Sequence, residues 1–147
     1  ATIERAVTDG ARWVIGGNVP DGLEHGAWLA PALLADVNPS SRIAQEETFA
    51  PLAILLSARD LDDALAIANG VPHGLVMSVH TRDERARARV LGAAEAGILQ
   101  LAAGSLAVHP RAPFSGWKAS GLGPPEHGVW DAAFYARTQA VYTDEPC

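Results

Sequence analysis

Hydrophobic residues form short unbroken runs in some segments of the chain and recur at helical spacing in others. The runs predict strands, and they lie at residues 13–15, 28–37, 52–56, 75–79 and 98–101. Apolar residues at helical spacing follow Asp60 and Asp83, two side chains suited to cap a helix N-terminus. Gly70 and Gly97 are expected to end these two helices.

The middle of the chain therefore reads strand, helix, strand, helix, strand. Helices of this length between apolar strands are typical of parallel βαβ units with right-handed crossovers, so we predict an α/β fold with a parallel sheet. A short helix is expected at 2–9 and another at 126–133, with a final strand at 134–143. Pro31 within the second apolar run predicts an edge strand or a bulge there.

Composition and charge argue against a nucleic-acid-binding protein and against a membrane-spanning one. The chain has 147 residues, 48% of them hydrophobic, which suits one domain with a real core. Its net charge of −6 argues against a nucleic-acid binder. Because it has neither an apolar run of about 18 residues nor a signal-peptide pattern, we expect no membrane span and a cytoplasmic location. The chain begins at Ala1 inside a helical pattern, which suggests a piece of a longer protein.

The stretch Gln45 to Pro51 carries the candidate chemistry. If it is extended, Glu47 and Phe49 share one face and stand roughly 7 Å apart. A carboxylate can accept hydrogen bonds from two sugar hydroxyls, and an aromatic ring can lie against a planar heterocycle. One face could thus hold a ribose beside a flat ring. The alternative is that the glutamates are solvated and Phe49 belongs to the core.

Reactive groups are scarce elsewhere in the sequence. The single cysteine is the terminal Cys147, and Ser105 and Ser120 do not lie in a G-x-S-x-G turn. The five histidines lack metal-ligand spacing. The acidic residues at 60–63 fit a first helical turn better than a metal site. We therefore predict neither a catalytic residue nor a metal ligand in this chain.

Four motifs in order and in register resemble the C-terminal part of NAD(P)-dependent aldehyde dehydrogenases. The similarity extends from about Ile3 to Tyr142. The motifs are Glu46 to Pro51, Ala68-Asn69 leading to His73-Gly74-Leu75, Glu95-Ala96-Gly97, and Pro113 to Gly121.

The resemblance implies roles for individual residues. Glu47 would bind the nicotinamide ribose hydroxyls, Phe49 would pack beside the nicotinamide ring, and Leu75 would lie near it. Phe114 would line the substrate tunnel, and the loop at 103–111 would shape the aldehyde entrance. Residues 1–133 would then be part of the catalytic domain.

The resemblance also implies an assembly. Residues 134–147 would form an oligomerisation strand and tail, and this strand would join the sheet of a neighbouring subunit. The expected partners are an aldehyde and further copies of the same chain.

The family's chemistry sets a further expectation. In these enzymes a cysteine attacks the aldehyde to give a thiohemiacetal, hydride passes to NAD or NADP, and water activated by a glutamate releases the acid. The resemblance places that cysteine and that glutamate upstream of Ala1. We therefore expect no aldehyde oxidation by these 147 residues alone.

Three positions depart from the family pattern, since Ala50 and Ser115 replace glycines and Ala102 replaces an asparagine. They leave open an alternative in which the chain is a non-catalytic assembly module. The run Gly123 to Gly128, followed by Phe134-Tyr135, is similar to the subgroup that oxidises semialdehydes, especially 2-oxoglutarate semialdehyde.

Overall fold

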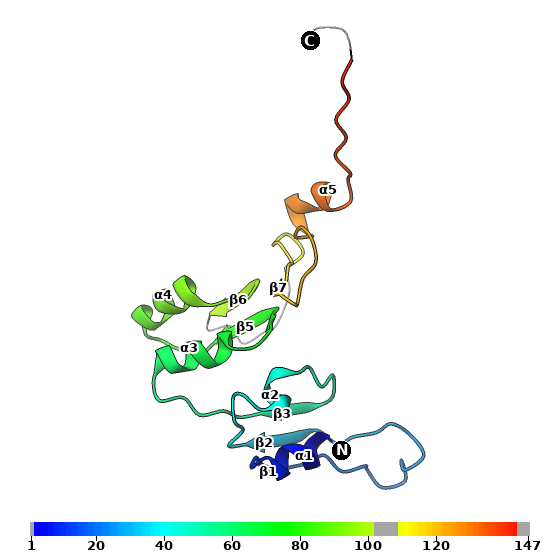
Figure 1. Cartoon of the computed structure of the whole chain (residues 1–147), viewed down its shortest axis with the longest axis vertical. Helices are drawn as coiled ribbons and strands as arrows, with labels where there is room; N and C mark the ends of the chain where they lie inside the picture. The colour runs from blue at the N-terminus through cyan, green and yellow to red at the C-terminus, as the bar shows by residue number, and fades with distance from the viewer. Residues whose placement is uncertain (1, 102–108, 144–147) are drawn as a thin grey trace. The chain divides into compact units, whose positions relative to one another are not determined.

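The computed structural model, drawn in Figure 1, describes residues 2–101 and 109–143. The chain divides into two compact units. The first unit is Ala1–Pro72 and the second is His73–Cys147. Helices and strands occur in both units, so the predicted α/β class is confirmed.

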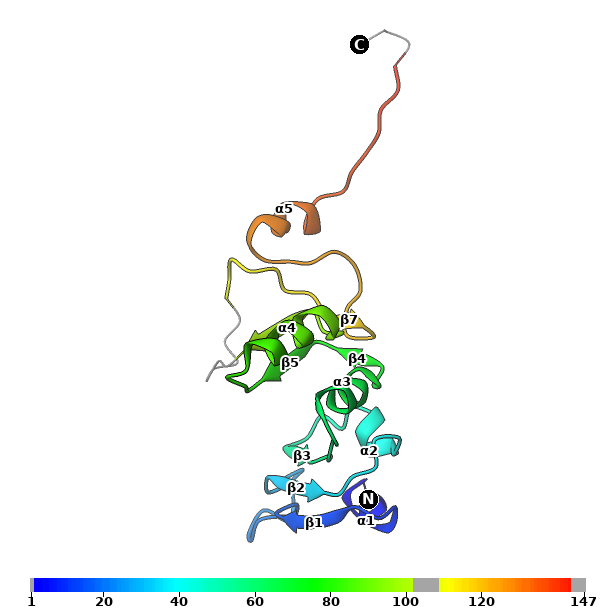
Figure 2. The same ribbon diagram turned by 90° about the vertical axis from the view of Figure 1, so that its left-hand side faces the viewer.

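The first unit is built on a three-stranded sheet, whose strands lie side by side in Figure 2. Strand β2 (Ala32–Ala35) is central; it pairs antiparallel with β1 (Arg12–Ile15) and parallel with β3 (Leu52–Ile54). Pro31 thus precedes a central strand, and the edge-strand prediction is wrong. The bulge lies in β1, between Trp13 and Ile15.

Helix α1 (Thr2–Thr8) packs its apolar face against this sheet. Ile3 and Ala6 of the helix form one buried cluster with Leu34 of β2, which is 0% exposed. Burial on both faces was expected for residues 52–56, but Leu55 is 53% exposed. The cluster therefore forms on one face of the sheet, the face that α1 covers.

A helix follows each of the strands β2 and β3 of the first unit. Helix α2 (Arg42–Gln45) connects β2 to β3, and α3 (Leu61–Asn69) follows β3. Asp60 caps α3 as predicted, because its carboxylate accepts a hydrogen bond from the backbone N–H of Asp63 at 2.9 Å. Gly70 ends that helix, also as predicted.

The second unit contains a parallel strand pair joined by a helix. Strands β5 (Val76–Val79) and β6 (Ile98–Leu101) pair in parallel, and α4 (Glu84–Ala93) connects them. Asp83 caps α4 through the backbone N–H of Arg85 at 2.8 Å, as predicted. The strand predicted at 52–56 was expected in the same sheet as β5 and β6, but it pairs with β2. The strand–helix–strand–helix–strand run of the prediction is therefore divided between two sheets.

The end of the second unit differs from the prediction. Strand β4 (His73–Gly74) pairs antiparallel with β7 (Trp117–Lys118), and then come a 3-10 turn, η1 (Gly128–Trp130), and α5 (Asp131–Phe134). Phe134 therefore ends a helix, and residues 135–143 lie in no helix or strand. Ala102 and most of the predicted entrance loop at 103–111 lie outside the described residues.

None of the helices in the described ranges is long and apolar enough to cross a membrane.

The first turn of α3 should make stability depend on pH. Arg59 donates hydrogen bonds to Asp63 and lowers the pKa of that carboxyl from 3.8 to about 2. A lowered folded-state pKa adds stability that is complete above the unfolded value and fades as pH falls through the folded value. Asp63→Asn should therefore lower the urea midpoint at pH 7 and lose this effect near pH 2. Arg59→Gln removes the other partner of the same ion pair and should give the same pH dependence; a midpoint at pH 7 that neither replacement lowers would contradict the assignment.

A close backbone approach should make any side chain at Gly97 destabilising. A Cβ on Gly97 would lie 1.7 Å from the carbonyl oxygen of Ser115, the residue after Phe114. Gly97→Ala should therefore lower the free energy of unfolding by about 1–3 kcal/mol, as overpacking does. Gly92→Ala in α4 is the control, because nothing lies within 4 Å of the added atom, and it should stabilise the helix by up to about 1 kcal/mol. Equal effects of the two alanines in urea unfolding would contradict this account.

Candidate cofactor site

A hydrogen-bonded turn fixes the start of the candidate stretch. The side-chain oxygen of Asn38 accepts hydrogen bonds from the backbone N–H and the hydroxyl of Ser40, at 2.9 and 2.8 Å. The Ser41 hydroxyl donates to the Asn38 carbonyl at 2.7 Å, and the Gln45 amide donates to the Pro39 carbonyl at 2.7 Å. Both ends of the four-residue helix α2 are thereby attached to the turn before it.

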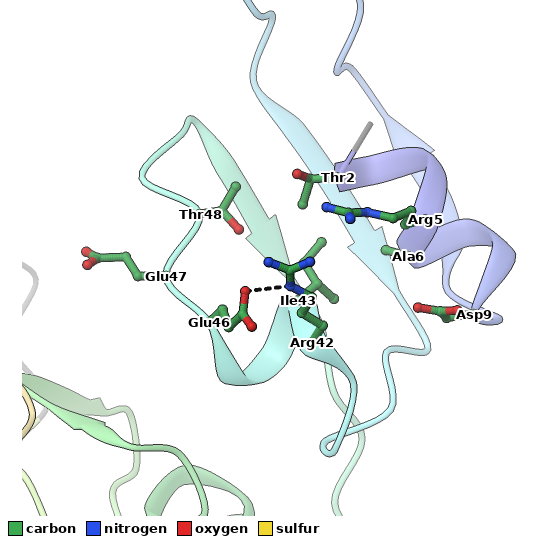
Figure 3. Close-up of a pocket in the computed structure, with 9 residues that line it drawn as sticks. All are labelled: Thr2, Arg5, Ala6, Asp9, Arg42, Ile43, Glu46, Glu47 and Thr48. Atoms are coloured by element: carbon green, nitrogen blue, oxygen red, sulfur yellow. Dashed lines mark hydrogen bonds and ion pairs between the residues drawn. The ribbon is translucent and has the colours of Figure 1, made fainter.

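The two adjacent carboxylates after α2 have different surroundings. Glu46 accepts a hydrogen bond from Nε of Arg42 at 2.6 Å, and its backbone N–H donates to the Arg42 carbonyl. Figure 3 shows Glu46 turned toward Arg42 and Glu47 pointing the opposite way. Both residues are exposed. Arg42 thus neutralises one carboxylate of the pair and leaves the other directed to solvent.

Phe49 breaks the expected strand. Its φ is +50°, in the left-handed region that a residue with a side chain rarely adopts, and β3 begins only at Leu52. Because a left-handed residue turns the chain, strand alternation does not relate Glu47 to Phe49, and the condition of an extended stretch is not met. The core alternative is wrong, since Phe49 is 93% exposed.

A hollow lies between α1 and the segment that runs from α2 to Thr48 (Figure 3). Its volume is about 220 Å³, and charged side chains from both sides line it. The lining residues are Thr2, Arg5, Ala6, Asp9, Arg42, Ile43, Glu46, Glu47 and Thr48. Glu47 contributes to this lining and Phe49 does not, so the two predicted residues do not share one cavity wall.

The other two predicted residues belong to the second unit. Leu75 lies between β4 and β5, is 39% exposed, and accepts a hydrogen bond from the N–H of Ile98 at 3.0 Å. Phe114 is half-buried and exchanges backbone hydrogen bonds with Glu126, at 2.8 and 3.1 Å. The assignment of these residues and of Glu47 and Phe49 to one site stays a prediction.

At two of the three positions that depart from the family pattern, the backbone conformation does not require glycine. Neither Ala50 nor Ser115 is among the described residues with positive φ, so neither position requires glycine for its conformation. Ala102 lies outside the described residues.

The sequence reasoning missed two side chains that contact predicted residues or their neighbours. Arg42 precedes Glu46 by four residues, and that spacing on a helix is a signal for an ion pair. His127 contacts the ring of Phe114, but the thirteen-residue separation gives no such signal.

Metal-binding side chains do not cluster in the part of the chain that the structure describes. Residues 2–101 and 109–143 contain no group of three or more His, Cys, Asp or Glu side chains that could hold a metal ion. Asp60 and Asp63, considered above for such a site, instead cap α3 and pair with Arg59.

Comparison with known proteins finds similarity to aldehyde dehydrogenases along nearly the whole chain. The model of the aldehyde dehydrogenase family matches residues 1–141. An alpha-ketoglutarate semialdehyde dehydrogenase of Haloferax volcanii is 36% identical over 143 residues, which is 95% of this chain and 30% of that protein. A betaine aldehyde dehydrogenase of Brucella anthropi is 35% identical over 144 residues, or 97% of this chain and 29% of that one.

Solved structures of the same family match the fold. An aldehyde dehydrogenase of Mycobacterium tuberculosis in complex with NAD+ has a TM-score of 0.79 and 35% identity, over 86% of this chain and 26% of that one. A betaine aldehyde dehydrogenase of Staphylococcus aureus in complex with NAD+ has a TM-score of 0.83 and 27% identity, over 91% of this chain and 26% of that one. The chain thus spans about 30% of the length of the curated relatives it matches. It belongs to the aldehyde dehydrogenase family.

Proposed function

We propose that this chain is part of an enzyme that oxidises an aldehyde to a carboxylic acid with NAD or NADP. The observation that carries the proposal is the stretch Glu46 to Pro51, with an unshielded carboxylate and an exposed aromatic ring, in a member of this family. Solved relatives are described in complex with NAD+. A dinucleotide of this kind accepts a hydride from the substrate.

Glu47 and Phe49 suit the nicotinamide end of that cofactor. The Glu47 carboxylate, directed away from Arg42, is available to accept hydrogen bonds from two ribose hydroxyls. The Phe49 ring is 93% exposed and offers a flat face to the nicotinamide. Leu75, which is 39% exposed, supplies an apolar contact near the same ring in this proposal.

Phe114 is the proposed wall of the substrate tunnel. The residue is half-buried, and its backbone is hydrogen-bonded to that of Glu126, which fixes the main chain at this position. The substrate class we propose is a semialdehyde. The support is the Gly123 to Gly128 run and the likeness to a protein named alpha-ketoglutarate semialdehyde dehydrogenase.

The reacting groups belong to the remainder of the enzyme in this proposal. The single cysteine of these residues, Cys147, lies outside the described range, and the chain spans about 30% of the relatives' length. These 147 residues then supply cofactor and substrate contacts but do not oxidise aldehydes by themselves.

We further propose that residues 1–133 are part of the catalytic domain and that 134–147 form an oligomerisation strand and tail. Residues 135–143 lie in no helix or strand, and Val141 and Tyr142 are 76% and 94% exposed. A segment that lies in no helix or strand can add a strand to a neighbouring subunit's sheet, and on doing so it would bury these two side chains.

The same exposed apolar side chains favour a second candidate function, a non-catalytic assembly module. The two candidates differ in cofactor-dependent turnover, which only the enzyme shows.

Replacement of Glu47 tests the enzymatic proposal. In the complete protein, we expect wild type to reduce NAD or NADP in the presence of a semialdehyde. Glu47→Gln should lower kcat/KM for the cofactor by about 10- to 100-fold, because a charge-assisted hydrogen bond is lost. The adjacent Glu46→Gln is the matched control and should stay within about threefold, since its ion pair with Arg42 is exposed.

Steady-state kinetics at varied cofactor concentration measure both variants. If the wild type turns over and Glu47→Gln has the same kcat/KM for the cofactor, Glu47 does not belong to the site. A wild type without turnover would favour the assembly module.

Removal of the C-terminal segment tests the assembly proposal. Deletion of residues 136–147 from the complete protein should reduce its molar mass in light scattering to that of a smaller assembly, because the added strand is lost. Deletion of 144–147 alone is the control and should leave the mass unchanged. An unchanged mass after the longer deletion would contradict the role of this segment.

A further inference from the structure

The ring of Phe114 is held by a small cluster in the second unit. Phe114 and Glu126 form an isolated antiparallel bridge, in which each backbone N–H donates to the other's carbonyl. The residue after Glu126 is His127, and its ring centroid lies 5.5 Å from that of Phe114, with 37° between the planes. The bridge thus brings the two side chains together although they are far apart in sequence.

The backbone around His127 is fixed in an unusual conformation. His127 has a φ of +74°, and its N–H donates a hydrogen bond to Oδ1 of Asp131 at 2.7 Å. Gly128, with a φ of +62°, follows it against the Arg111 carbonyl, where a Cβ would lie 2.5 Å from the oxygen. Contacts on both sides of His127 therefore hold a conformation that costs free energy for a residue with a side chain.

The imidazole is placed for ring packing rather than for hydrogen bonding. Its Nδ1 atom is buried and has no hydrogen-bond partner among the described residues. Burial of an unpaired polar atom costs free energy, and the contact that the imidazole makes in the structure is with the tilted Phe114 ring. The His127 imidazole thus lies against one side of the Phe114 ring.

We infer that His127 is a positioning residue that fixes the Phe114 ring and thereby sets which aldehydes the enzyme accepts. This inference rests on the proposed tunnel role of Phe114. With the imidazole behind it, the ring is a rigid wall that disfavours bulky aldehydes. Without the imidazole the ring can turn aside, and the wall yields to a larger substrate.

Asparagine is the replacement that separates the ring contact from the backbone. Asn tolerates positive φ better than most residues, so His127→Asn keeps the conformation at 127 and removes the aromatic contact. His80→Asn is the matched control, because His80 is exposed and lies in the same unit. Phe114→Leu removes the ring itself and supplies the second arm of a double-mutant cycle.

The measurement is kcat/KM of the complete enzyme for benzaldehyde divided by that for propanal, with saturating cofactor. His127→Asn should raise this ratio by about threefold or more, in line with the contribution of an aromatic pair. In the Phe114→Leu background the same replacement should leave the ratio unchanged, because the ring through which it acts is absent. His80→Asn should match wild type.

Three results would overturn the inference. In the first, the ratio for His127→Asn stays within about 1.5-fold of the wild-type ratio or falls below it. In the second, His127→Asn changes the ratio equally with and without the Phe114 ring. In the third, His80→Asn changes the ratio as much as His127→Asn does. A merely structural role would lower the melting temperature and scale both rates together, which leaves the ratio unchanged. A wild type without aldehyde oxidation would instead overturn the proposed function on which the inference rests.

Discussion

The pairing of β2 with both of its neighbours is the constraint on which the candidate site depends. Leu34 in this strand is 0% exposed, and hydrogen bonds from Ala32 to Pro51 and from Leu55 to Leu34 join β2 to the segment that becomes β3. Because both ends of the connection are fixed, residues 42–51 form a crossover anchored at α2 and at Leu52. Residues 46–50 are exposed as a consequence. The sheet thus presents Glu47 and Phe49 without being part of the site itself.

Electrostatics distinguishes two carboxylates that are neighbours in sequence. Arg42 lies one helical turn before Glu46 and pairs with it at 2.6 Å, which directs the guanidinium away from Glu47. The pair is exposed, so it adds little stability. Its consequence is geometric: the first carboxylate is occupied and the second is available to a ligand. A ribose, which offers two neutral hydroxyls, suits one unpaired carboxylate better than two adjacent negative charges.

The sequence predicted features governed by local chemistry better than those governed by distant pairing. Asp60 and Asp83 cap the helices where expected, because an N-cap depends on the next three residues. The partner of β3 depends on β2, some twenty residues earlier, and the spacing of helices did not reveal it. The motif identified Glu47 and Phe49 as candidates. The left-handed backbone at Phe49 could not be predicted from the residue type, since glycine or asparagine usually adopts that conformation. His127 was missed because only the Phe114–Glu126 bridge brings it to Phe114.

A crystal structure of the complete protein with NAD+ would show whether Glu47 binds the cofactor. We expect the carboxylate oxygens of Glu47 to lie within about 3.2 Å of the two hydroxyls of the nicotinamide ribose. We also expect the Phe49 ring to lie against the nicotinamide. A bound cofactor whose ribose is held by other side chains, with Glu47 still directed to solvent, would contradict the proposed role of Glu47.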